Sequence, residues 1–490
     1  MAHSQARAKA CAMMLAGLLS ACTTLPHEAP VGIEPVPADP ARTGTFTKVH
    51  TMGRHLLHSF TFNPIKQPLT AVRDLVVLTA TSSIDYTRGF ALDAIGVLQP
   101  GRRSTLWLNH GDGMDLPGWE RKLDRITGTR QLSGNLDLMI DGVEYFSRLL
   151  EAVADAHASV QLRTYIFDND DFAVRVANLL KYRAEEISVR VMMDGIGSWS
   201  GSYAQSASVP APYTNAPMDI ASYLRHDANV KVRVLPNTWF AGDHTKAVIV
   251  DRTLAFVGGM NIGREYRFDW HDIMVAVTGS VVDQLGADFD SAWNHSTYGD
   301  LALLQPSSNR RQTQDDGSQR LRLLYTKPGN AQIYRAQLEA IKRARQHIYV
   351  QNAYFSDDSI RRALISARGR GVDVRVILPS RGDSGPMDRS NVLAVNDLRD
   401  HGVRVFVFPG MSHVKAALFD GWVCFGSANL DRLSLRVNKE LDIATSDPSI
   451  VDAFVTRLFE PDFARSVEVT APLPTRWSDR IYETLADVML

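Results

Sequence analysis

Apolar and polar positions along this chain follow the same succession twice, in a helical period that leads each time into a short β-branched run. In the first half this helix-then-strand pattern begins at Phe146, and in the second half it begins at Tyr334. Two further β-branched runs, each preceded by a helical stretch, follow at residues 187–194 and 230–236 in the first half and at 372–379 and 403–409 in the second. Short strands that alternate with helices of this length indicate βαβ units around a mixed sheet. The sequence therefore predicts an α/β fold of two duplicated domains.

Composition shifts mark the boundaries of these domains. Residues 23–44 are rich in Pro, Ala, Thr and Glu, which is typical of a tether, and the polar stretch 305–320 is typical of a linker. Residues 45–140 carry one short apolar run and no motif, so they receive no predicted role. The predicted segments are a leader at 1–21, a tether at 22–44, a region of unknown role at 45–140, a first domain at 141–304, a linker at 305–320 and a second domain at 321–490.

The leader has the features of a bacterial export signal. Arg7 and Lys9 precede the apolar stretch Ala10–Leu19, which is shorter than the roughly 18 residues that a membrane-spanning helix needs. The following Ser-Ala-Cys resembles the bacterial lipobox, so we expect Cys22 to be acylated and to anchor the protein in a membrane. Because Thr23 is not aspartate, the usual sorting pattern predicts the outer membrane, facing the periplasm. A plain secretory signal with an incidental cysteine is the alternative.

Charge and cysteine content restrict the function classes further. The formal net charge of the 490 residues is −1, which argues against a general nucleic-acid binder, and no nucleic-acid partner is expected. The three cysteines are Cys11, Cys22 and Cys424. Processing of the leader leaves Cys424 as a single thiol in an apolar run, so no intrachain disulfide is expected.

A sparse motif occurs once in each half. Residues 244–251 read HTKAVIVD and residues 413–420 read HVKAALFD. A Gly-x-x-Asn group and then an acid follow each copy, and a single-residue deletion accounts for the difference in spacing. A lone His-x-Lys is usually a solvent-facing strand, but five residue types in two matching registers are not explained that way. The candidate site residues are His244, Lys246, Asp251, Asn261 and Asp272 in the first half and His413, Lys415, Asp420, Asn429 and Glu440 in the second.

These motifs resemble those of the phospholipase D superfamily. The stretches FVGGMNIGREY at 256–266 and NLDRLSLRVNKELDI at 429–443 resemble the bacterial cardiolipin synthase branch in particular, and the similarity covers roughly residues 141–465. The resemblance implies two α/β domains packed around one shared active site. It also implies a membrane-tethered phosphatidyltransferase that acts on a phospholipid such as phosphatidylglycerol.

The residue types suit that chemistry. A neutral imidazole is a competent nucleophile toward phosphorus, and the lysines would neutralise the phosphodiester's charge. The two asparagines would donate hydrogen bonds to the same oxygens, and Asp272 and Glu440 would each orient an imidazole. By analogy with the family, His244 forms a phosphohistidine and His413 serves as acid and base, although the symmetry permits the reverse. Asp251 and Asp420 are interpreted as structural rather than acid–base groups.

Several alternatives stay open at the level of sequence. A hydrolytic phospholipase D is the nearest alternative function, and a phosphodiesterase or nuclease of the same superfamily is a more distant one. No His-Glu-x-x-His or paired-cysteine spacing is present, so no metal or other cofactor is expected. Trp239 and Phe240 either form a lipid-facing rim or pack under a loop. The head group, the acceptor alcohol and the oligomeric state are left open.

Overall fold

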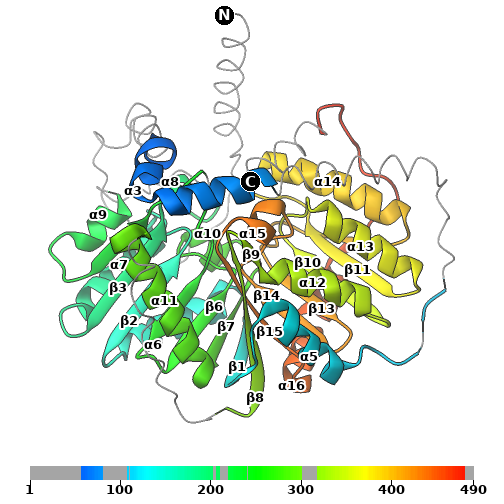
Figure 1. The fold of residues 1–490 in the computed structure, drawn as a ribbon, viewed down its shortest axis with the longest axis horizontal. Coiled ribbons are helices and arrows are strands. Elements are labelled where there is room, and N and C mark those ends of the chain that lie inside the picture. Colours follow the sequence, from blue (N-terminus) through cyan, green and yellow to red (C-terminus); the bar gives the residue numbers. More distant parts are fainter. Residues whose placement is uncertain are drawn as a thin grey trace, which may run out of the picture.

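The computed structural model describes residues 57–80, 107–109, 111–201, 206–209, 219–239, 241–300 and 317–479 (Figure 1). The predicted leader, Cys22, the tether and residues 305–316 of the linker lie outside these residues. The described part begins with two short helices, η2 (His58–Phe62) and α3 (Asn63–Lys66), followed by a helical stretch over 68–80. None of the helices described is long and apolar enough to cross a membrane.

The first half alternates helices and strands as its apolar pattern predicts. In chain order its elements are α5 (Leu116–Thr127), β1 (Leu132–Ile140), α6 (Asp141–Ala154), β2 (Ser159–Thr164), α7 (Asp171–Arg183), β3 (Ser188–Asp194), α8 (Gly195–Gly201), α9 (Ile220–Arg225), β4 (Lys231–Leu235), β5 (Ala247–Val250), β6 (Leu254–Gly258), α10 (Arg264–Phe268), β7 (Ile273–Thr278) and α11 (Ser280–Tyr298).

The second half repeats this succession. Its elements are β8 (Gln319–Lys327), β9 (Asn330–Ala331), α12 (Gln332–Arg343), β10 (His347–Asn352), α13 (Asp358–Gly369), β11 (Asp373–Pro379), α14 (Gly385–Asp400), β12 (Arg404–Phe408), β13 (Lys415–Phe419), β14 (Trp422–Gly426), α15 (Arg432–Arg436), β15 (Glu440–Thr445), α16 (Pro448–Phe454), η4 (Val455–Phe459), α17 (Glu460–Arg465) and β16 (Val467–Glu468). The predicted α/β fold of two duplicated domains is confirmed.

The strands of both halves form one continuous sheet. Among the described residues the order is β16-β12-β11-β10-β13-β14-β15-β8-β1-β7-β6-β5-β2-β3-β4, with β9 beside β8. In each half three strands pair in parallel, the strands toward the centre pair antiparallel, and β16 pairs antiparallel with β12 at the outer edge of the second half. The halves join where β1 pairs antiparallel with β8, from Leu132 opposite Leu321 to Gly134 opposite Gln319. From β12 to β8 the strands follow one another as their counterparts do from β4 to β1 at the other end of the sheet. The two halves are therefore related by an approximate twofold axis.

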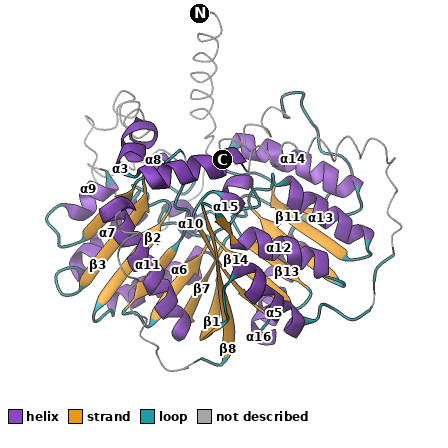
Figure 2. Ribbon diagram, viewed as in Figure 1, coloured by secondary structure: helices purple, strands orange, loops and turns teal. Residues whose placement is uncertain are grey.

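Alternation along the strands divides the core into two layers. On β1, Leu138 belongs to one apolar cluster and its neighbour Met139 to another, because successive side chains of a strand point to opposite faces. Helix α6 covers the Met139 face with Phe146 and Leu149, and α11 covers the opposite face with Leu285 and other apolar residues. Figure 2 shows helices flanking the strands of each half. A single stripe of apolar positions on each helix is therefore enough to cover the sheet.

The central strands extend both halves beyond the predicted segments. Strand β1 lies in the region 45–140 that received no role, and it pairs with β7 of the first half over six positions. Helix α5 from the same region packs on the second half instead, where the rings of Trp119 and Trp422 meet edge to face at 5.2 Å. Strand β8 begins at Gln319, inside the stretch predicted as a linker. Their part in the fold depends on pairing between halves, which local pattern does not reveal.

Candidate active site

The two motifs meet at the boundary between the halves. His244 and Lys246 come directly before β5, and His413 comes two residues before Lys415, where β13 begins. The backbone N–H of each histidine donates to the carbonyl of the residue that precedes the other half's acid, at 2.9 Å for His244 and 2.7 Å for His413. These two backbone bonds hold each motif against the acid-bearing strand of the opposite half.

Each histidine is paired with the acid of the other half. Nδ1 of His244 lies 2.9 Å from Oε2 of Glu440, and Nδ1 of His413 lies 2.7 Å from Oδ2 of Asp272. All four side chains are buried, and both carboxyl groups are completely shielded from solvent. The predicted His–acid pairs therefore exist, and they cross between the halves. One site is built from both domains, as the fold prediction states.

The two motif lysines lie against the histidines of their own half. Nζ of Lys246 donates to the carbonyl of His244 at 2.8 Å, and Nζ of Lys415 donates to the carbonyl of His413 at 2.6 Å. Burial lowers the pKa of both ammonium groups, that of Lys415 to about 8. A bound phosphodiester would bring a negative charge beside each ammonium and raise these pKa values again. The lysines thus form a cationic site for an anionic group.

Electrostatics prepare the histidines as nucleophile and base. Burial, reinforced by the charges of Lys246 and Lys415, holds the pKa of both imidazoles well below its usual value, so both are neutral at pH 7. Burial also raises the pKa of Asp272 and of Glu440 to about 7. When these acids are ionised, each accepts a hydrogen bond from Nδ1–H of a neutral imidazole, which leaves the lone pair on Nε2. Nε2 is then the atom that can attack phosphorus.

A glycine and a serine adjust the two acids to their different lengths. Oγ of Ser427 donates to Oε2 of Glu440 at 2.6 Å and so fixes the longer side chain. Gly259 occupies the corresponding position in the first half. A Cβ there would lie 2.4 Å from Oδ1 of Asp272, so this position excludes any side chain. The difference between the Gly-Gly and Gly-Ser pairs therefore follows from the exchange of Asp for Glu.

The other four predicted residues lie in different surroundings. Asn261 is already engaged: its Oδ1 accepts from the backbone of Ile166 (3.0 Å) and its Nδ2 donates to the hydroxyl of Tyr266 (2.8 Å). Oδ1 of Asn429 is buried and accepts no hydrogen bond from the described residues. Asp251 and Asp420 follow the far ends of β5 and β13, where their carboxylates accept several backbone N–H groups. They close turns, and the structure does not bring them to the histidines.

Comparisons with known proteins agree with this geometry. A family model described as cardiolipin synthase, phospholipase D-like domain, matches residues 149–293 and 338–462, which is one match in each half. The chain belongs to the phospholipase D superfamily, in its cardiolipin synthase-like branch. The predicted resemblance is confirmed.

Individual relatives of this phospholipase D-type chain point the same way. It is 31% identical over 347 residues to cardiolipin synthase A of Pseudomonas fluorescens, which covers 68% of this chain and 69% of the relative. The chain is also 31% identical over 378 residues to cardiolipin synthase A of Pseudomonas syringae pathovar syringae. This match covers 73% of this chain and 74% of the relative. The crystal structure of phosphatidylserine synthase from Haemophilus influenzae shares the fold, with a TM-score of 0.58, 12% identity, and coverage of 76% of this chain and 100% of that one.

Buried ion pairs support the phospholipase D-type site from outside, and sequence reasoning missed them. Next to His244, Asp243 accepts two hydrogen bonds from Arg163, at 2.9 and 2.7 Å, and lies 3.6 Å from Lys439. Arg163 also reaches Asp288 of α11 at 2.8 Å. In the second half, Gln351, Ser412 and His271 stand at the positions of Arg163, Asp243 and Lys439. Gln351 donates to Ser412 at 3.0 Å and to Asp462 at 2.8 Å. Because the types change between the halves, no repeated motif could identify them.

Aromatic side chains form part of the walls around the two histidines. The ring of Tyr165 meets that of His244 edge to face at 4.7 Å, and its face lies 5.3 Å from Nζ of Lys246. The rings of Tyr266 and Trp270 lie 5.7 and 5.2 Å from that of His413. These aromatic rings help to exclude water from the imidazoles, which accounts for part of the depressed pKa values.

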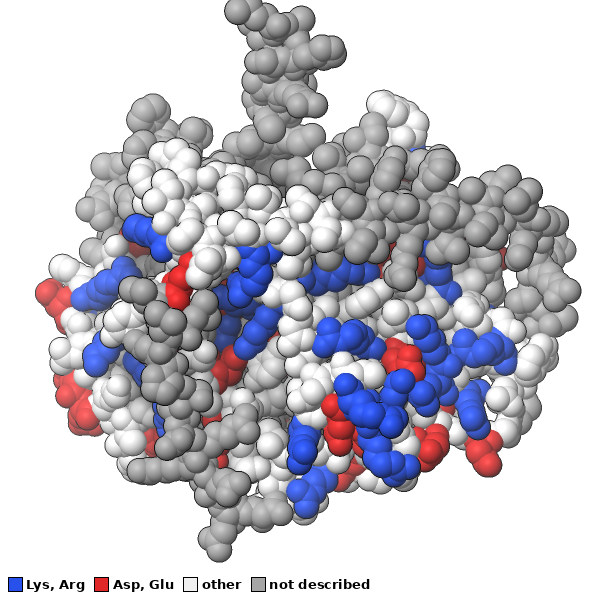
Figure 3. All heavy atoms as spheres, viewed as in Figure 1, with Lys and Arg blue, Asp and Glu red and all other residues white. Residues whose placement is uncertain are grey.

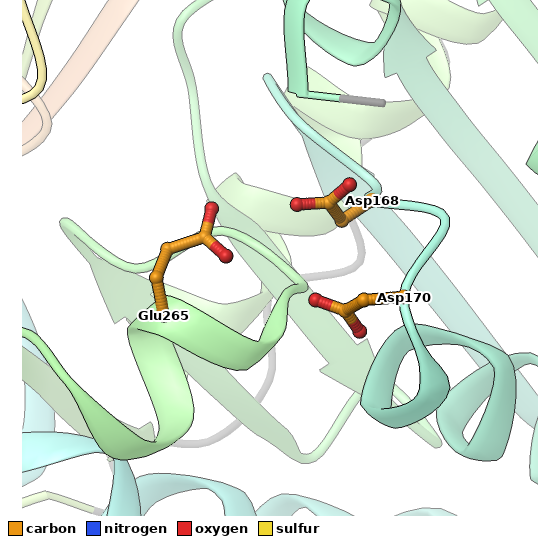
Figure 4. A group of neighbouring side chains, drawn as sticks. All are labelled: Asp168, Asp170 and Glu265. Atoms are coloured by element: carbon orange, nitrogen blue, oxygen red, sulfur yellow. The ribbon is translucent and has the colours of Figure 1, made fainter. Parts of the chain in front are cut away.

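Three acids near Asn261 could hold a metal ion, judged by their spacing alone. Asp168, Asp170 and Glu265 are buried and point toward one another in Figure 4. Both oxygens of Asp170 already accept backbone N–H groups, from Ala173 at 2.7 Å and from Arg264 at 2.5 Å. Burial, together with the charge of Asp170, raises the pKa of Glu265 to about 8, so this group is protonated at neutral pH. The contacts therefore favour a proton shared between carboxyl groups at this position.

Proposed function

We propose that the protein transfers phosphatidyl groups between phospholipids, with phosphatidylglycerol as both donor and acceptor and cardiolipin and glycerol as products. The observation that carries this proposal is the pairing of each histidine with the acid of the other half, beside two buried lysines. The arrangement supplies two neutral imidazoles, each oriented at Nδ1, around one cationic site. A two-step displacement at phosphorus needs one imidazole as nucleophile and the other as proton carrier.

The proposed reaction has two displacements at the same phosphorus. In the first, Nε2 of His244 attacks and the bond from phosphorus to the glycerol oxygen breaks. His413, which is neutral in the free protein, takes up a proton from solvent at Nε2 as the anionic phosphodiester binds, and it gives this proton to the leaving oxygen. In the second, the hydroxyl of another phosphatidylglycerol attacks the phosphohistidine, His413 takes its proton, and the phosphorus–nitrogen bond breaks. Lys246 and Lys415 neutralise the charge that grows on the other phosphate oxygens. The histidines return to their starting states, so protons and charge balance over the cycle.

Two features support transfer over hydrolysis. The similarity to cardiolipin synthases extends over about two thirds of the chain and includes both catalytic halves. The buried histidines also favour a positioned acceptor, since a well-oriented alcohol can reach effective molarities of about 10⁵ M or more and so outcompete water.

Product analysis decides between these outcomes. Purified protein is incubated with phosphatidylglycerol in detergent micelles, and lipid and water-soluble products are separated and quantified. The proposal expects cardiolipin and free glycerol in equal amounts. Phosphatidic acid as the dominant product, even with excess acceptor lipid, would identify a hydrolytic phospholipase D. Cleavage of DNA without any lipid product would place the protein among the nucleases of the superfamily.

We further infer that Cys22 is acylated and holds the enzyme at the periplasmic face of the outer membrane. The Leu-Ser-Ala-Cys sequence ending at Cys22 and the threonine that follows support this inference. Two or more acyl chains anchor a protein stably, whereas one chain alone is marginal. Cys22→Ser is expected to release the protein from the membrane fraction or to block its processing. Unchanged fractionation and processing of that variant would exclude the lipoprotein assignment.

A further inference from the structure

The N-terminal part of the described chain presents its apolar side chains outward. Residues 57–80 form η2, α3 and the helical stretch 68–80, which lie on the first half, extend to its boundary with the second half and are dark blue in Figure 1. They supply eight of the sixteen large apolar side chains that are exposed in the described part of the protein. These eight are Leu57, Phe60, Phe62, Ile65, Leu69, Val72, Leu75 and Val76. We name this surface the apolar face.

The buried side of the same segment is polar or small, which reverses the usual arrangement of a surface helix. In water an amphipathic helix turns its apolar stripe toward the core. Here the buried positions are Ser59, Gln67, Thr70, Ala71 and Asp74, whereas Ile65, Leu69 and Val72 are 74%, 66% and 62% exposed. This arrangement is stable when the exposed side of the segment contacts an apolar environment rather than water.

Specific hydrogen bonds fix this orientation. Asp300 accepts from the backbone N–H of Leu69 at 2.7 Å and from the hydroxyl of Thr70 at 2.6 Å. The indole N–H of Trp239 donates to the carbonyl of Ala71 at 2.9 Å, so this residue, for which the sequence left a rim and a packing role open, supports the segment. Because polar contacts anchor the inner side, the outward direction of the apolar side chains is set by the fold.

The exposed charges of residues 57–80 are basic, and the neighbouring carboxylate of Asp300 is engaged by Leu69 and Thr70. Lys66 and Arg73 are exposed, and the one acid of residues 57–80, Asp74, is buried against Arg73 and Thr238. Figure 3 shows a nearly uncharged surface at the place where Figure 1 draws the dark-blue segment. An uncharged apolar surface with a basic border is complementary to a bilayer that contains anionic lipids.

Hydrogen bonds connect the segment to the catalytic site. The hydroxyl of Ser59 and the amide of Asn63 both donate to the carbonyl of Asn237. The side chain of Asn237 donates to Asp194 at 2.8 Å, and the same carboxylate oxygen accepts the backbone N–H of Asp243, the residue before His244. A cleft lies between the segment and the loops beside the catalytic histidine. The segment lines it with Gln67, Thr70 and Asp74, and the loops line it with Gly242, Val437 and Lys439.

We propose that the apolar face inserts into the surface of a bilayer containing anionic phospholipids and brings the cleft beside His244 to that surface. The proposal rests on the proposed function, because a phospholipid substrate has to leave the bilayer to reach the buried histidines. Residues 23–56 separate the segment from the predicted acyl anchor at Cys22, so an anchored chain can reach the same membrane. The anchor would keep the protein near the bilayer, and the apolar face would orient it.

Vesicle flotation with matched variants tests the docking surface. All proteins carry Cys22→Ser, so that acylation cannot mask the contribution of the segment. The test variant is Ile65→Asp with Leu69→Asp and Val72→Asp. The control variant is Val143→Asp with Tyr182→Asp and Val467→Asp, which are 60%, 62% and 72% exposed elsewhere on the protein. Circular dichroism confirms that both variants are folded.

Vesicles of phosphatidylglycerol and phosphatidylcholine are expected to bind the test variant about tenfold or more weakly than the Cys22→Ser parent, because binding scales with buried apolar area. The control variant is expected to bind like the parent, and pure phosphatidylcholine vesicles to bind the parent more weakly. Equal binding of test variant and parent would overturn the proposal. A second result would also overturn it. If light scattering shows that the parent is a dimer and the test variant a monomer, while both bind vesicles equally, a second copy of the chain covers the apolar face.

Activity measurements separate this proposal from the proposed function. The test variant is expected to lose turnover of phosphatidylglycerol in vesicles and to keep turnover of a short-chain, monomeric phosphatidylglycerol. Loss of vesicle binding in a protein that converts no phospholipid at all would support the docking surface and remove the proposed function. Normal cardiolipin formation from vesicles by the test variant would remove the docking surface and leave the proposed function in place.

Discussion

The protonation states of three buried side chains decide when the site can react. Each histidine keeps its Nδ1–H toward its partner, and Nε2 available for the reaction, only while that partner, Asp272 or Glu440, is ionised and accepts the hydrogen bond from Nδ1–H. Lys415 binds the phosphate through charge only while it is protonated. Burial has moved the pKa of both acids up to about 7 and that of Lys415 down to about 8. The window between these values is narrow.

Activity is therefore expected to peak between about pH 7 and 8. On the acid side it rises as pH rises through about 7, since Asp272 and Glu440 become ionised. On the alkaline side it falls as pH rises through about 8, because Lys415 becomes neutral. Values of kcat/KM, which report the groups of the free enzyme, test the profile when they are measured across this range on a short-chain phosphatidylglycerol. In Lys415→Arg, which stays charged, the alkaline limb should move to higher pH, and an unmoved limb would assign it to another group.

Metal independence is a second prediction at this scale. Both oxygens of Asp170 are engaged by backbone N–H groups and Glu265 is protonated at neutral pH, so these carboxyl groups form a poor site for a divalent cation. In the proposed reaction the lysines supply the positive charge at the phosphate. Exhaustive treatment with EDTA is therefore expected to leave the rate unchanged. Loss of activity that one particular divalent ion restores would contradict this and would direct attention to Asp168, Asp170 and Glu265.

The sequence reveals the catalytic residue types and leaves their pairing hidden. Two matching registers identify six residues that the structure brings together, because each half keeps the same spacing along its own strands. Those registers do not show that Asp272 faces His413 rather than His244, since that pairing depends on contact between the halves. Asp251 and Asp420 share the motif for a different reason, as both close the turn after a buried strand. Arg163 and His271 leave no repeated pattern.

Among the elements, the residue His271, two positions before β7, links the two halves through its side chain. We call this contact the brace. His271 lies between Asp141, at the start of α6, and Asp462 of α17, with 2.7 Å from each ring nitrogen to the facing oxygen. Its ring also stacks on Phe408 of β12 at 4.8 Å. Burial alone would lower the pKa of His271, but the hydrogen bonds and charges of the two carboxylates raise it to about 9. The imidazolium therefore stabilises the contact between first and second half.

The pH dependence of stability tests this brace. A group whose pKa is raised on folding contributes stability that is complete below its unfolded pKa near 6.5 and is lost as pH rises through about 9. Replacing the charge with His271→Gln is expected to lower the free energy of unfolding by on the order of 3 kcal/mol near pH 6 and by much less near pH 10. Urea unfolding of both proteins at the two pH values measures this difference. An equal loss at both would show that the brace acts by packing rather than by charge.

Helices and strands could be predicted where the spacing of apolar residues followed a clear helical or strand period. The patterns that begin at Phe146 and Tyr334 became α6 with β2 and α12 with β10, because each helix has one apolar stripe and each strand a buried run. Strand β1 and helix α5 were not identified, since β1 gains its stability from pairing with β7 and β8, far away in sequence. The reversed polarity of residues 57–80 was missed because a sequence does not say which side of a helix faces the protein.

At the scale of the whole molecule, a single chain provides the complete site. The sheet runs without interruption from β4 to β16 through the pairing of β1 with β8, and each histidine depends on the acid of the opposite half. Gly134 lies at this junction opposite Gln319 of β8, and a Cβ there would lie 2.6 Å from the carbonyl oxygen of Thr278 on β7, so the position requires glycine. A half-molecule would expose an unpaired sheet edge and lose the partner of its histidine. Folding and catalysis therefore require both halves together.

Mixing two inactive proteins tests whether the site is confined to one chain. His244→Ala and His413→Ala are each expected to lower turnover of phosphatidylglycerol by at least about 10³-fold, because each removes either the nucleophile or the proton carrier. Each variant keeps an intact half, so exchange of halves between chains would rebuild a complete site. Since the halves share one sheet, an equal mixture of the two folded variants, and the same mixture refolded together from urea, should stay as inactive as either alone. Recovery of activity only after joint refolding would show that the halves can pair between chains. Recovery on simple mixing would place the working site at an interface between two copies.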